Sequence, residues 1–458
     1  MFTYIKAKNF KSLKNLEFNL NKTKHETNKL IAIYGENGSG KTNLVELFKF
    51  LQQLIISRMF DVKFNMLPKD FFDLKEKIMD NTPIDMQPIW RLTVNLEEYR
   101  TINEKEDTEI EYGFKINDKE GFYSIKFNTE IIEEKLYYFV NKQKGYYFKL
   151  YKDGKRIIKK LNKNIFTNEK YNMELEENIE KYWGKYSFLS LLAFEENEKN
   201  WEYVNNNISK KLFDIIDKLL SMTIHVNKWY LKIIPDNLMK KNVLFDLKSD
   251  TVSKNQISEI KRYEKILNIF FKQAYADIKS VKYNIEEKED KIKYKLYFNK
   301  MIGGTLRSIP VELESEGTKR IIDEFDTLIG AIMGETVVID EIDNGIHDLL
   351  MKNIILSIKD EITGQLIITT HNTLLLEVLP KDCIYILSAD YEGNKNINSL
   401  KEYGMKIQKN HNARDLYFKG LFGGIPTTSY VDFEEIKYVL DDLEDKEETT
   451  NDEKTELL

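Results

Sequence analysis

The sequence predicts an α/β fold with a mixed β/helical insertion in its middle. The first observation is a short apolar strand at residues 30–34, which runs through the octet GENGSGKT into a helical pattern. The second is a pair of apolar strands, at residues 336–340 and 365–370, that are separated by a helix. The third is the long stretch between them, about residues 65–300, whose pattern changes from strands to helices. We therefore expect one α/β domain assembled from both ends of the chain.

The composition excludes several classes of protein. A length of 458 residues fits two to four domains or one domain with a large insertion, and 42% apolar residues exclude wholesale disorder. The single cysteine, Cys383, excludes a disulfide framework and is typical of a reducing cytosol. The first residues lack the apolar core of a signal peptide, and no stretch approaches the ~18 apolar residues of a membrane span. We therefore expect a cytoplasmic protein.

The formal charge of −6 is concentrated at the C-terminal end. Residues 431–458 contain twelve acidic residues and three lysines, a net charge of −9, so the other residues sum to +3. A nearly neutral body does not indicate nucleic-acid binding, although a local basic face is compatible with it. The acidic stretch lacks periodicity, which predicts a solvated, disordered tail. A docking tail or a DNA mimic is the alternative for such a charge run.

The N-terminal part of the predicted domain covers residues 1–64. Alternating apolar residues in YIKAKNF and NLEFNL indicate two strands, and LIAIY is typical of a fully buried strand. An amphipathic helix is expected directly after the octet, because apolar residues repeat there at helical spacing. These residues are Leu44, Val45, Leu47, Phe48, Leu51, Leu54 and Ile55.

The remaining chain divides by pattern into four parts. Residues 65–165 are expected to be a β-rich continuation of the domain, with the strand-like stretches IWRLTVNL, EIEYGFKIN, YSIKFN, KLYYFVN and YYFKLYKDGKRI. Residues 166–300 are expected to form a helical insertion, most clearly from Ser187 to Met222 and from Gln256 to Ala276. Residues 301–430 form the C-terminal part of the domain, which includes a helix from Thr318 to Met333 and another from Asp348 to Ile358. Residues 431–458 are the acidic tail.

The octet GENGSGKT, residues 35–42, matches the phosphate-binding pattern G-x-x-x-x-G-K-[ST] between a strand and a helix. Glycines let successive backbone N–H groups face an anion, and the helix N-terminus adds partial positive charge. Lys41 is then placed to reach the β- and γ-phosphates of a nucleotide, and the Thr42 hydroxyl to ligate Mg²⁺. A structural glycine-rich turn is the alternative. The expected nucleotide-binding residues are Gly35, Glu36, Asn37, Gly38, Ser39, Gly40, Lys41, Thr42 and Asn43.

Two further strand ends carry the groups that such a loop needs. The strand TVVID ends in Asp340, which can hold Mg²⁺ through water, and Glu341 follows as a candidate general base for the attacking water. The alternative is that these acids only cap the next helix. The strand QLIITT ends at His371, which is placed to contact a γ-phosphate, with a structural histidine as the alternative. Lys41, Glu341 and His371 are therefore the candidate catalytic residues.

The stretch LESEGTKR, residues 313–320, opens the helix that runs to Met333. A serine hydroxyl at Ser315, a bare backbone at Gly317 and a helix N-terminus together make a candidate anion site. An ordinary N-cap by Ser315 or Thr318 is the alternative, and the stretch taken alone favours it.

With these stretches in this order, the chain resembles the ABC-type ATPases of the SMC, Rad50 and OLD kind, and most closely the stand-alone bacterial group called AAA15 or AAA21. The resemblance covers roughly residues 1–60 and 305–430. YIKAKNFKSLKNLEF resembles the opening strand pair, GENGSGKT the Walker A motif, DEIDNGIHDLL the Walker B motif with its D-loop, and TTHN the switch-histidine strand. NARDLYFKGLFGGIP resembles a late Gly-Gly-Ile-Pro stretch of that group.

The resemblance implies an ABC-type ATPase head, a P-loop NTPase, with ATP and Mg²⁺ as cofactors, that works as a homodimer or a higher oligomer. Ser315 and Gly317 would belong to the signature motif and act in trans on ATP held by the partner, although S-E-G-T departs from the transporter pattern S-G-G-Q. Asp343 would be the D-loop carboxylate at that interface. Lys11 and Ser12 would approach the nucleotide.

Stand-alone ATPases that resemble this chain include the AriA-like ATPase of PARIS, the AbiL-type partners of RloB proteins and the Septu ATPase, all from anti-phage systems. This resemblance implies an ATP-gated switch that controls a separate effector, such as a nuclease or a Toprim or RloB-like protein. The alternative is an SMC- or Rad50-like ATPase that acts on DNA in repair or as a clamp. A self-contained OLD-type nuclease would need a Toprim domain, and the 87 residues after His371 contain no D-x-D. Gln87 is the nearest candidate for the family's Q-loop glutamine.

Overall fold

The structure is a computed structural model that divides into two compact units, Met1–Gly424 and Ile425–Leu458. It describes residues 1–65, 94–199, 201–226, 229–232, 246–403, 412–425 and 431–440. The predicted Q-loop candidate, Gln87, lies outside these residues.

A seven-stranded sheet forms the centre of the first unit, in the order β10-β9-β15-β16-β3-β17-β18. Its strands β9, β15, β16, β3 and β17 run parallel, while β10 and β18 pair antiparallel at the two edges. Every residue of β3, β15 and β16 is buried, as expected for parallel strands that are covered on both faces. The bounds are β3 Leu30–Tyr34, β9 Met222–Val226, β10 Trp229–Lys232, β15 Thr336–Ile339, β16 Gln365–Thr369, β17 Ile384–Ala389 and β18 Lys395–Ser399.

A second, antiparallel sheet of seven strands has the order β2-β1-β4-β5-β6-β7-β8. The predicted β-rich stretch therefore continues the sheet that the N-terminal strand pair begins. The bounds are β1 Phe2–Phe10, β2 Leu13–Asn19, β4 Thr108–Ile116, β5 Lys119–Phe127, β6 Ile131–Val140, β7 Gln143–Asp153 and β8 Arg156–Leu161. One predicted strand, at residues 89–96, is wrong where the structure describes it, because Asn95 caps a 3₁₀ turn at Leu96–Tyr99.

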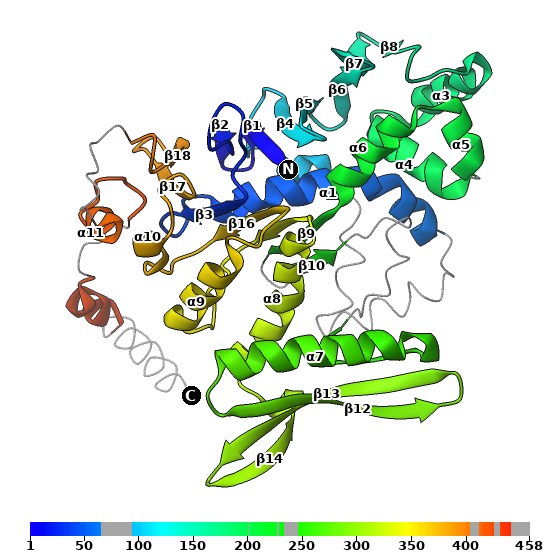
Figure 1. Ribbon diagram of the computed structural model, residues 1–458. Helices are drawn as coiled ribbons and strands as arrows, with labels where there is room; N and C mark the ends of the chain where they lie inside the picture. The colour runs from blue at the N-terminus through cyan, green and yellow to red at the C-terminus, as the bar shows by residue number, and fades with distance from the viewer. Residues whose placement is uncertain are drawn as a thin grey trace, which may run out of the picture. The chain divides into compact units, whose positions relative to one another are not determined.

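The helix α1, Lys41–Asn65, lies between the two sheets (Figure 1). On one side the Tyr112 hydroxyl of β4 donates to the Leu47 carbonyl at 2.7 Å. On the other side the Gln52 amide donates to the Met222 carbonyl of β9 at 2.8 Å. The buried core therefore includes a sheet–helix–sheet arrangement, and its helix begins at Lys41, inside the octet.

Four helices follow β8 and are tied to the second sheet by a buried carboxylate. Glu134 of β6 accepts from the Trp183 indole at 2.9 Å and from the backbone N–H of Phe188 at 2.6 Å. Burial raises the pKa of Glu134, and these donors oppose the rise. The helices are α3 Glu169–Tyr182, α4 Phe188–Glu198, α5 Trp201–Asn207 and α6 Lys210–Leu220.

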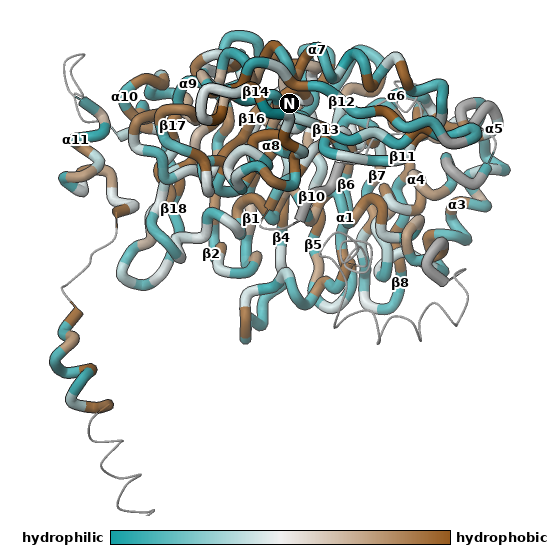
Figure 2. The backbone as a smooth tube through the Cα atoms, turned by 90° about the horizontal axis from the view of Figure 1, so that it is seen from below, coloured by the Kyte–Doolittle hydropathy of each residue, from teal (hydrophilic) through white to brown (hydrophobic). Residues whose placement is uncertain are grey.

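A smaller antiparallel sheet packs against α7, Ile257–Ala274, whose alternating polar and apolar residues are visible in Figure 2. Its strands are β11 Ser249–Ser253, β12 Ile278–Lys288, β13 Lys291–Ile302 and β14 Thr305–Pro310. After it, α8 packs on strands β15 and β16 of the central sheet. The remaining helices are α8 Glu316–Ile332, α9 Asp348–Ile358, α10 Leu375–Val378 and α11 Ala413–Phe418.

The predicted helical insertion at residues 166–300 therefore needs correction. It contains α3 to α7, but it also contains β9 of the central sheet and most of the small sheet. The segment MTIHV of β9 directly follows helix α6, and a run of five residues is too short for periodicity to separate a strand from a continuing helix. The insertion thus contributes strands to the central sheet and also adds helices and a small sheet outside it.

Of the second unit, the structure describes Ile425 and residues 431–440. The sequence predicts a disordered tail there, whereas residues 433–440 form a short helix whose side chains are all exposed. Residues 441–458 of the tail lie outside the described residues. Among the helices that the structure describes, none is long and apolar enough to cross a membrane.

Candidate functional site

The octet at residues 35–42 connects the end of β3 to the start of α1, as its pattern predicts. The loop turns back on itself, because the Ser39 N–H donates to the Glu36 carbonyl at 3.1 Å. Gly40 has φ +104°, a backbone conformation that residues other than glycine rarely adopt. At Gly35 a Cβ atom would lie 2.6 Å from the Leu387 carbonyl oxygen of β17, so only glycine fits against that strand.

The Lys41 side chain folds over this loop. Its ammonium donates to the Gly35 carbonyl at 2.7 Å and to the Glu36 carbonyl at 3.0 Å. Burial lowers the pKa of Lys41, while the nearby carboxylates Asp340 and Glu341 oppose the change. The cation is thus held in the hollow of the loop, where an anion would meet it.

Asp340 and Thr42 are adjacent although they lie far apart in the sequence. Asp340 follows β15, and its Oδ2 accepts a hydrogen bond from the Thr42 hydroxyl at 2.8 Å. A hydroxyl and a carboxylate oxygen are ligands that fit Mg²⁺, which commonly takes its other ligands from water and phosphate. The described residues contain no cluster of three acidic, histidine or cysteine side chains that could hold a metal. The pair therefore fits a metal that needs a bound phosphate to complete its coordination.

A residue that the sequence analysis missed, Thr369, joins the two acidic residues. Its hydroxyl accepts from the Glu341 N–H at 2.7 Å and donates to Oδ1 of Asp340. Thr369 is fully buried at the end of β16, the strand that pairs with β15. The sequence feature that could have indicated Thr369 is its hydroxyl at the end of the otherwise apolar run LIIT, on the strand next to the one that Asp340 follows.

Glu341 has an unusual backbone conformation, with φ +50°. For a residue other than glycine this conformation costs of order 1 kcal/mol or more and is common at functional sites. The Glu341 carbonyl accepts from the Arg320 guanidinium of α8 at 3.1 Å and from the Asn344 N–H at 3.0 Å. Arg320 also lies 3.6 Å from the buried Glu324 carboxylate. The strained peptide is thus held from three sides, since Thr369 binds its N–H.

His371 lies two residues beyond β16 and next to the predicted D-loop. Its backbone N–H donates to the Asp343 carboxylate at 3.0 Å. Burial, followed by the charge of Lys41, lowers the pKa of His371 from 6.5. The imidazole is therefore neutral at pH 7. Because the charges of Lys41 and Glu341 both act on the pKa of His371, the histidine lies close to the octet and to Glu341.

Ser315 forms the N-cap of α8. Its hydroxyl accepts from the Thr318 N–H at 3.2 Å. Within one chain, Ser315 is therefore an ordinary helix N-cap, which was the alternative to an anion site. A Cβ atom on Gly317 would lie 2.6 Å from the Gly345 carbonyl oxygen. The stretch LESEGTKR and the segment after Glu341 therefore pack closely, which explains why glycine stands at 317.

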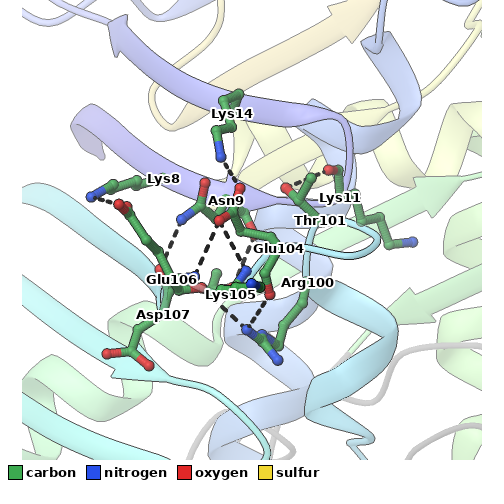
Figure 3. Close-up of polar contacts among 11 residues, drawn as sticks. Lys8, Asn9, Lys11, Lys14, Arg100, Thr101, Glu104, Lys105, Glu106 and Asp107 are labelled. Carbon is green, nitrogen blue, oxygen red and sulfur yellow. Dashed lines mark hydrogen bonds and ion pairs between the residues drawn. The ribbon is translucent and has the colours of Figure 1, made fainter.

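Lys11 and Ser12 form the turn between β1 and β2, beside the octet. Ser12 accepts from the Asn43 side chain of α1 at 2.6 Å. The Lys11 ammonium is ion-paired with Glu46 and lies 5.2 Å from the centre of the Tyr99 ring. Figure 3 shows the Thr101 hydroxyl bonded to the Lys11 carbonyl, at 2.7 Å, while the Lys11 side chain points away from that cluster. Lys11 is thus bound to α1 in this structure.

Two further contacts with the octet were not predicted. The Lys395 ammonium at the start of β18 donates to the Gly38 carbonyl at 3.3 Å. In the late Gly-Gly-Ile-Pro stretch, a Cβ on Gly424 would lie 3.5 Å from the Gly35 α-carbon. The Tyr417 hydroxyl holds the Gly424 carbonyl at 2.9 Å. The late stretch therefore supports the phosphate loop from behind.

Comparison with protein families finds one matching model, described as "AAA domain, putative AbiEii toxin, Type IV TA system", over residues 30–377. The match spans 348 of 458 residues, from β3 through the octet, Glu341 and His371. Among curated proteins, no sequence matches.

Several solved structures are similar to the chain. An SMC head bound to the C-winged helix domain of ScpA has 14% identity and a TM-score of 0.42, covering 88% of this chain and 99% of that one. The SMC head domain from Thermotoga maritima has 13% identity and a TM-score of 0.36, covering 87% and 98%. An SMC head with an extended coiled coil, bound to the C-terminal domain of ScpA from Pyrococcus furiosus, has 15% identity and a TM-score of 0.35, covering 89% and 98%.

Proposed function

The chain belongs to the family described as "AAA domain, putative AbiEii toxin, Type IV TA system", and from this membership we propose that it is an ABC-type ATPase that binds and hydrolyses ATP to switch a partner effector. The observation that carries the proposal is the meeting of the octet with Asp340, Glu341 and His371 at the C-terminal ends of the inner strands β3, β15 and β16. These are the groups that position a nucleoside triphosphate, hold its metal and activate water.

Binding of ATP rests on the octet and on Lys41. The ammonium now bonds to two neutral carbonyls, at 2.7 and 3.0 Å. Charge-assisted bonds to phosphate oxygens are roughly twice as strong as neutral bonds, so the β- and γ-phosphates would replace these partners. Thr42 and Asp340 would hold Mg²⁺, Asp340 through water, and the ion would neutralise phosphate charge.

Hydrolysis is assigned to Glu341 as general base, with His371 at the γ-phosphate. A base must be held rigidly to abstract a proton from a single water, and the Glu341 backbone is fixed by Thr369, Arg320 and Asn344. The lowered pKa keeps His371 neutral at pH 7, so that it offers one donor and one acceptor to phosphate or water.

Dimerisation around ATP is supported by the exposed surface next to Ser315 and the D-loop. Leu313 is 76% exposed and Leu349 is 55% exposed, although both are large apolar side chains. Leu313 opens the LESEGTKR stretch and Leu349 follows the DEIDNG segment, the two places that the trans arrangement would bring to a partner. Ser315, Gly317 and Asp343 would then complete the nucleotide site of the second copy.

The proposed switch acts through a partner effector. ATP can shift a head only through its different affinity for two states, and another molecule must read out that shift. The proposed readers are anti-phage effectors such as a nuclease or a Toprim or RloB-like protein. The competing function is an SMC- or Rad50-like DNA clamp.

The chemical part is tested with purified full-length protein. Lys41→Ala should lose ATP binding, and Glu341→Gln should bind ATP but hydrolyse it at least ~100-fold more slowly, the scale of a lost general base. Glu361→Gln makes the same change at an exposed loop position and serves as the control. Equal ATPase rates in wild type and Glu341→Gln would remove Glu341 from its role.

The dimer and the partner need separate tests. If Ser315 acts in trans, a mixture of Lys41→Ala and Ser315→Arg chains should regain part of the activity, because one composite site per heterodimer is intact. A confirmed heterodimer without rescue contradicts the trans arrangement. A pull-down from cells that express the native neighbouring genes should recover more partner with Glu341→Gln than with Lys41→Ala. Recovery of duplex DNA instead, with a steep salt dependence, would favour the clamp function.

A further inference from the structure

A second hollow lies on the outer face of the antiparallel sheet, away from the octet. This cleft of about 650 Å³ is formed by β1, the segment after β2, strands β5 and β6, and the residues around Asp382 and Lys401. Strand β18 packs beside β2 here, so two distant parts of the chain form one wall (Figure 1). Tyr4 and Asn19 lie at the end of the β1–β2 hairpin opposite to Ser12, which is about 20 Å along the strands. The cleft is therefore separate from the octet.

One wall of the cleft is an aromatic surface. Phe122 and Tyr137 both line it, and their rings stack with centres 5.2 Å apart and planes 22° apart. Tyr146, which does not line the cleft, meets Tyr137 edge to face, with ring centres 4.8 Å apart and planes 64° apart. The three residues lie on neighbouring strands β5, β6 and β7, and each is half-buried.

The same cleft is lined by charged side chains of both signs. The lysines are Lys22, Lys24, Lys144 and Lys401, and the carboxylates are Glu120, Asp382 and Glu402. The ion pairs of Lys22 are long, 3.6 Å to Glu26 and 3.9 Å to Asp382. Lys144 lies 3.7 Å from Glu120, and Lys24 forms no ion pair with the described residues. The Lys401 ammonium donates to the Lys22 carbonyl at 3.1 Å. Exposed pairs of this kind contribute about 0–1 kcal/mol, so the ammonium groups can turn to a stronger anionic partner.

Stacked rings across strands also stabilise a sheet by themselves, about 0.2–1 kcal/mol per pair. Stability alone does not require a hollow in front of the rings or lysines from three segments around it. Partly exposed aromatic rings with cations nearby are the chemistry that binds a nucleotide, whose base stacks on a ring while its phosphate meets the lysines.

We propose that this cleft binds a nucleotide unit, with the base on Phe122 and Tyr137 and the phosphate between Lys24 and Lys401. The unit comes from single-stranded nucleic acid or from a free nucleotide, since both present a base and a phosphate. The inference goes beyond the proposed ATPase, because none of these residues belongs to the site at the octet. It would give the head a ligand of its own to sense.

The test uses the full-length Lys41→Ala chain, in which the octet cannot hold phosphate, and a fluorescein-labelled U12 RNA or dT12 DNA followed by anisotropy. The double variant Lys24→Glu/Lys401→Glu should bind at least about tenfold more weakly, because two phosphate-neutralising charges are reversed. Tyr137→Ile keeps a β-forming, apolar side chain and should weaken binding about five- to tenfold through lost stacking. The control is Lys105→Glu/Lys155→Glu, which makes the same charge change at two exposed positions that do not line the cleft.

Competition with unlabelled UMP separates the two sources. Displacement of U12 by UMP below about 1 mM supports a free nucleotide, and resistance to UMP with tight binding of U12 supports a single strand. The proposal is overturned if U12, dT12 and UMP all fail to bind, or if the cleft variants bind as tightly as the control. The ATPase rate of the same cleft variants with Lys41 restored should equal that of wild type, so failure here leaves the proposed ATPase intact.

Discussion

Replacement of Thr369 by valine tests how the site is held together. Valine has nearly the same shape as threonine but has no hydroxyl. The change removes the bond from the hydroxyl to the Asp340 carboxylate and leaves the Glu341 N–H without its acceptor. Thr369 is 0% exposed and Asp340 is 3% exposed, so water cannot replace either partner easily.

The magnitude follows from these two losses. A hydrogen bond to a charged group contributes about 1.5–3 kcal/mol, and an unsatisfied buried N–H costs about 1–3 kcal/mol. Because the two share one hydroxyl, they do not add fully, and we expect about 3 kcal/mol less stability for Thr369→Val. The Glu341 peptide should also move, since its φ of +50° is held by that bond, and the ATPase rate should fall at least ~10-fold.

The assay compares thermal unfolding, ATP binding and ATP hydrolysis with those of a matched variant. Thr327→Val removes another buried hydroxyl, which donates to the Asp323 carbonyl at 3.2 Å within α8. It should lose about 1 kcal/mol, the worth of one neutral bond, without a change in ATPase rate. Equal effects of the two substitutions on unfolding and on ATPase would refute the role of Thr369.

Two further predictions concern the loop and the switch histidine. Gly35→Ala places a Cβ 2.6 Å from the Leu387 carbonyl, so the loop must shift and the thermal stabilisation by ATP should be lost; Gly145→Ala, whose Cβ meets nothing nearer than 3.5 Å, should behave as wild type, and retained stabilisation in Gly35→Ala would contradict the packing. Because the folded-state pKa of His371 lies below 6.5, the folded protein resists protonation there, and the acidic limb that His371 contributes to kcat/KM should lie below pH 6.5 and be absent in His371→Asn; a His371-dependent limb at or above pH 6.5 would contradict the lowered pKa.

The sequence predicts which segments meet at the candidate site better than it predicts the course of the insertion around it. The octet, Asp340 and His371 each stand directly after an apolar strand, and a parallel sheet brings such strand ends together, so their meeting follows from local pattern. Thr369 and Lys395 were missed because a single polar residue in or beside a strand has many possible neighbours. β9 was missed because five residues after a helix carry no periodicity of their own.

The placement of β9 changes how the insertion relates to the chemistry. The His225 carbonyl of β9 accepts from the Asp340 N–H at 2.8 Å, and the His225 ring lies 3.0 Å from the Glu324 carboxylate of α8. Glu324 in turn lies 3.6 Å from Arg320, which donates to the Glu341 carbonyl at 3.1 Å. Buried polar groups in such a chain of contacts cannot move independently without losing a partner. A force on the insertion that displaces β9 therefore acts on Asp340 through its backbone N–H and on Glu341 through helix α8. The same contacts would carry a change at the nucleotide site outward to the insertion.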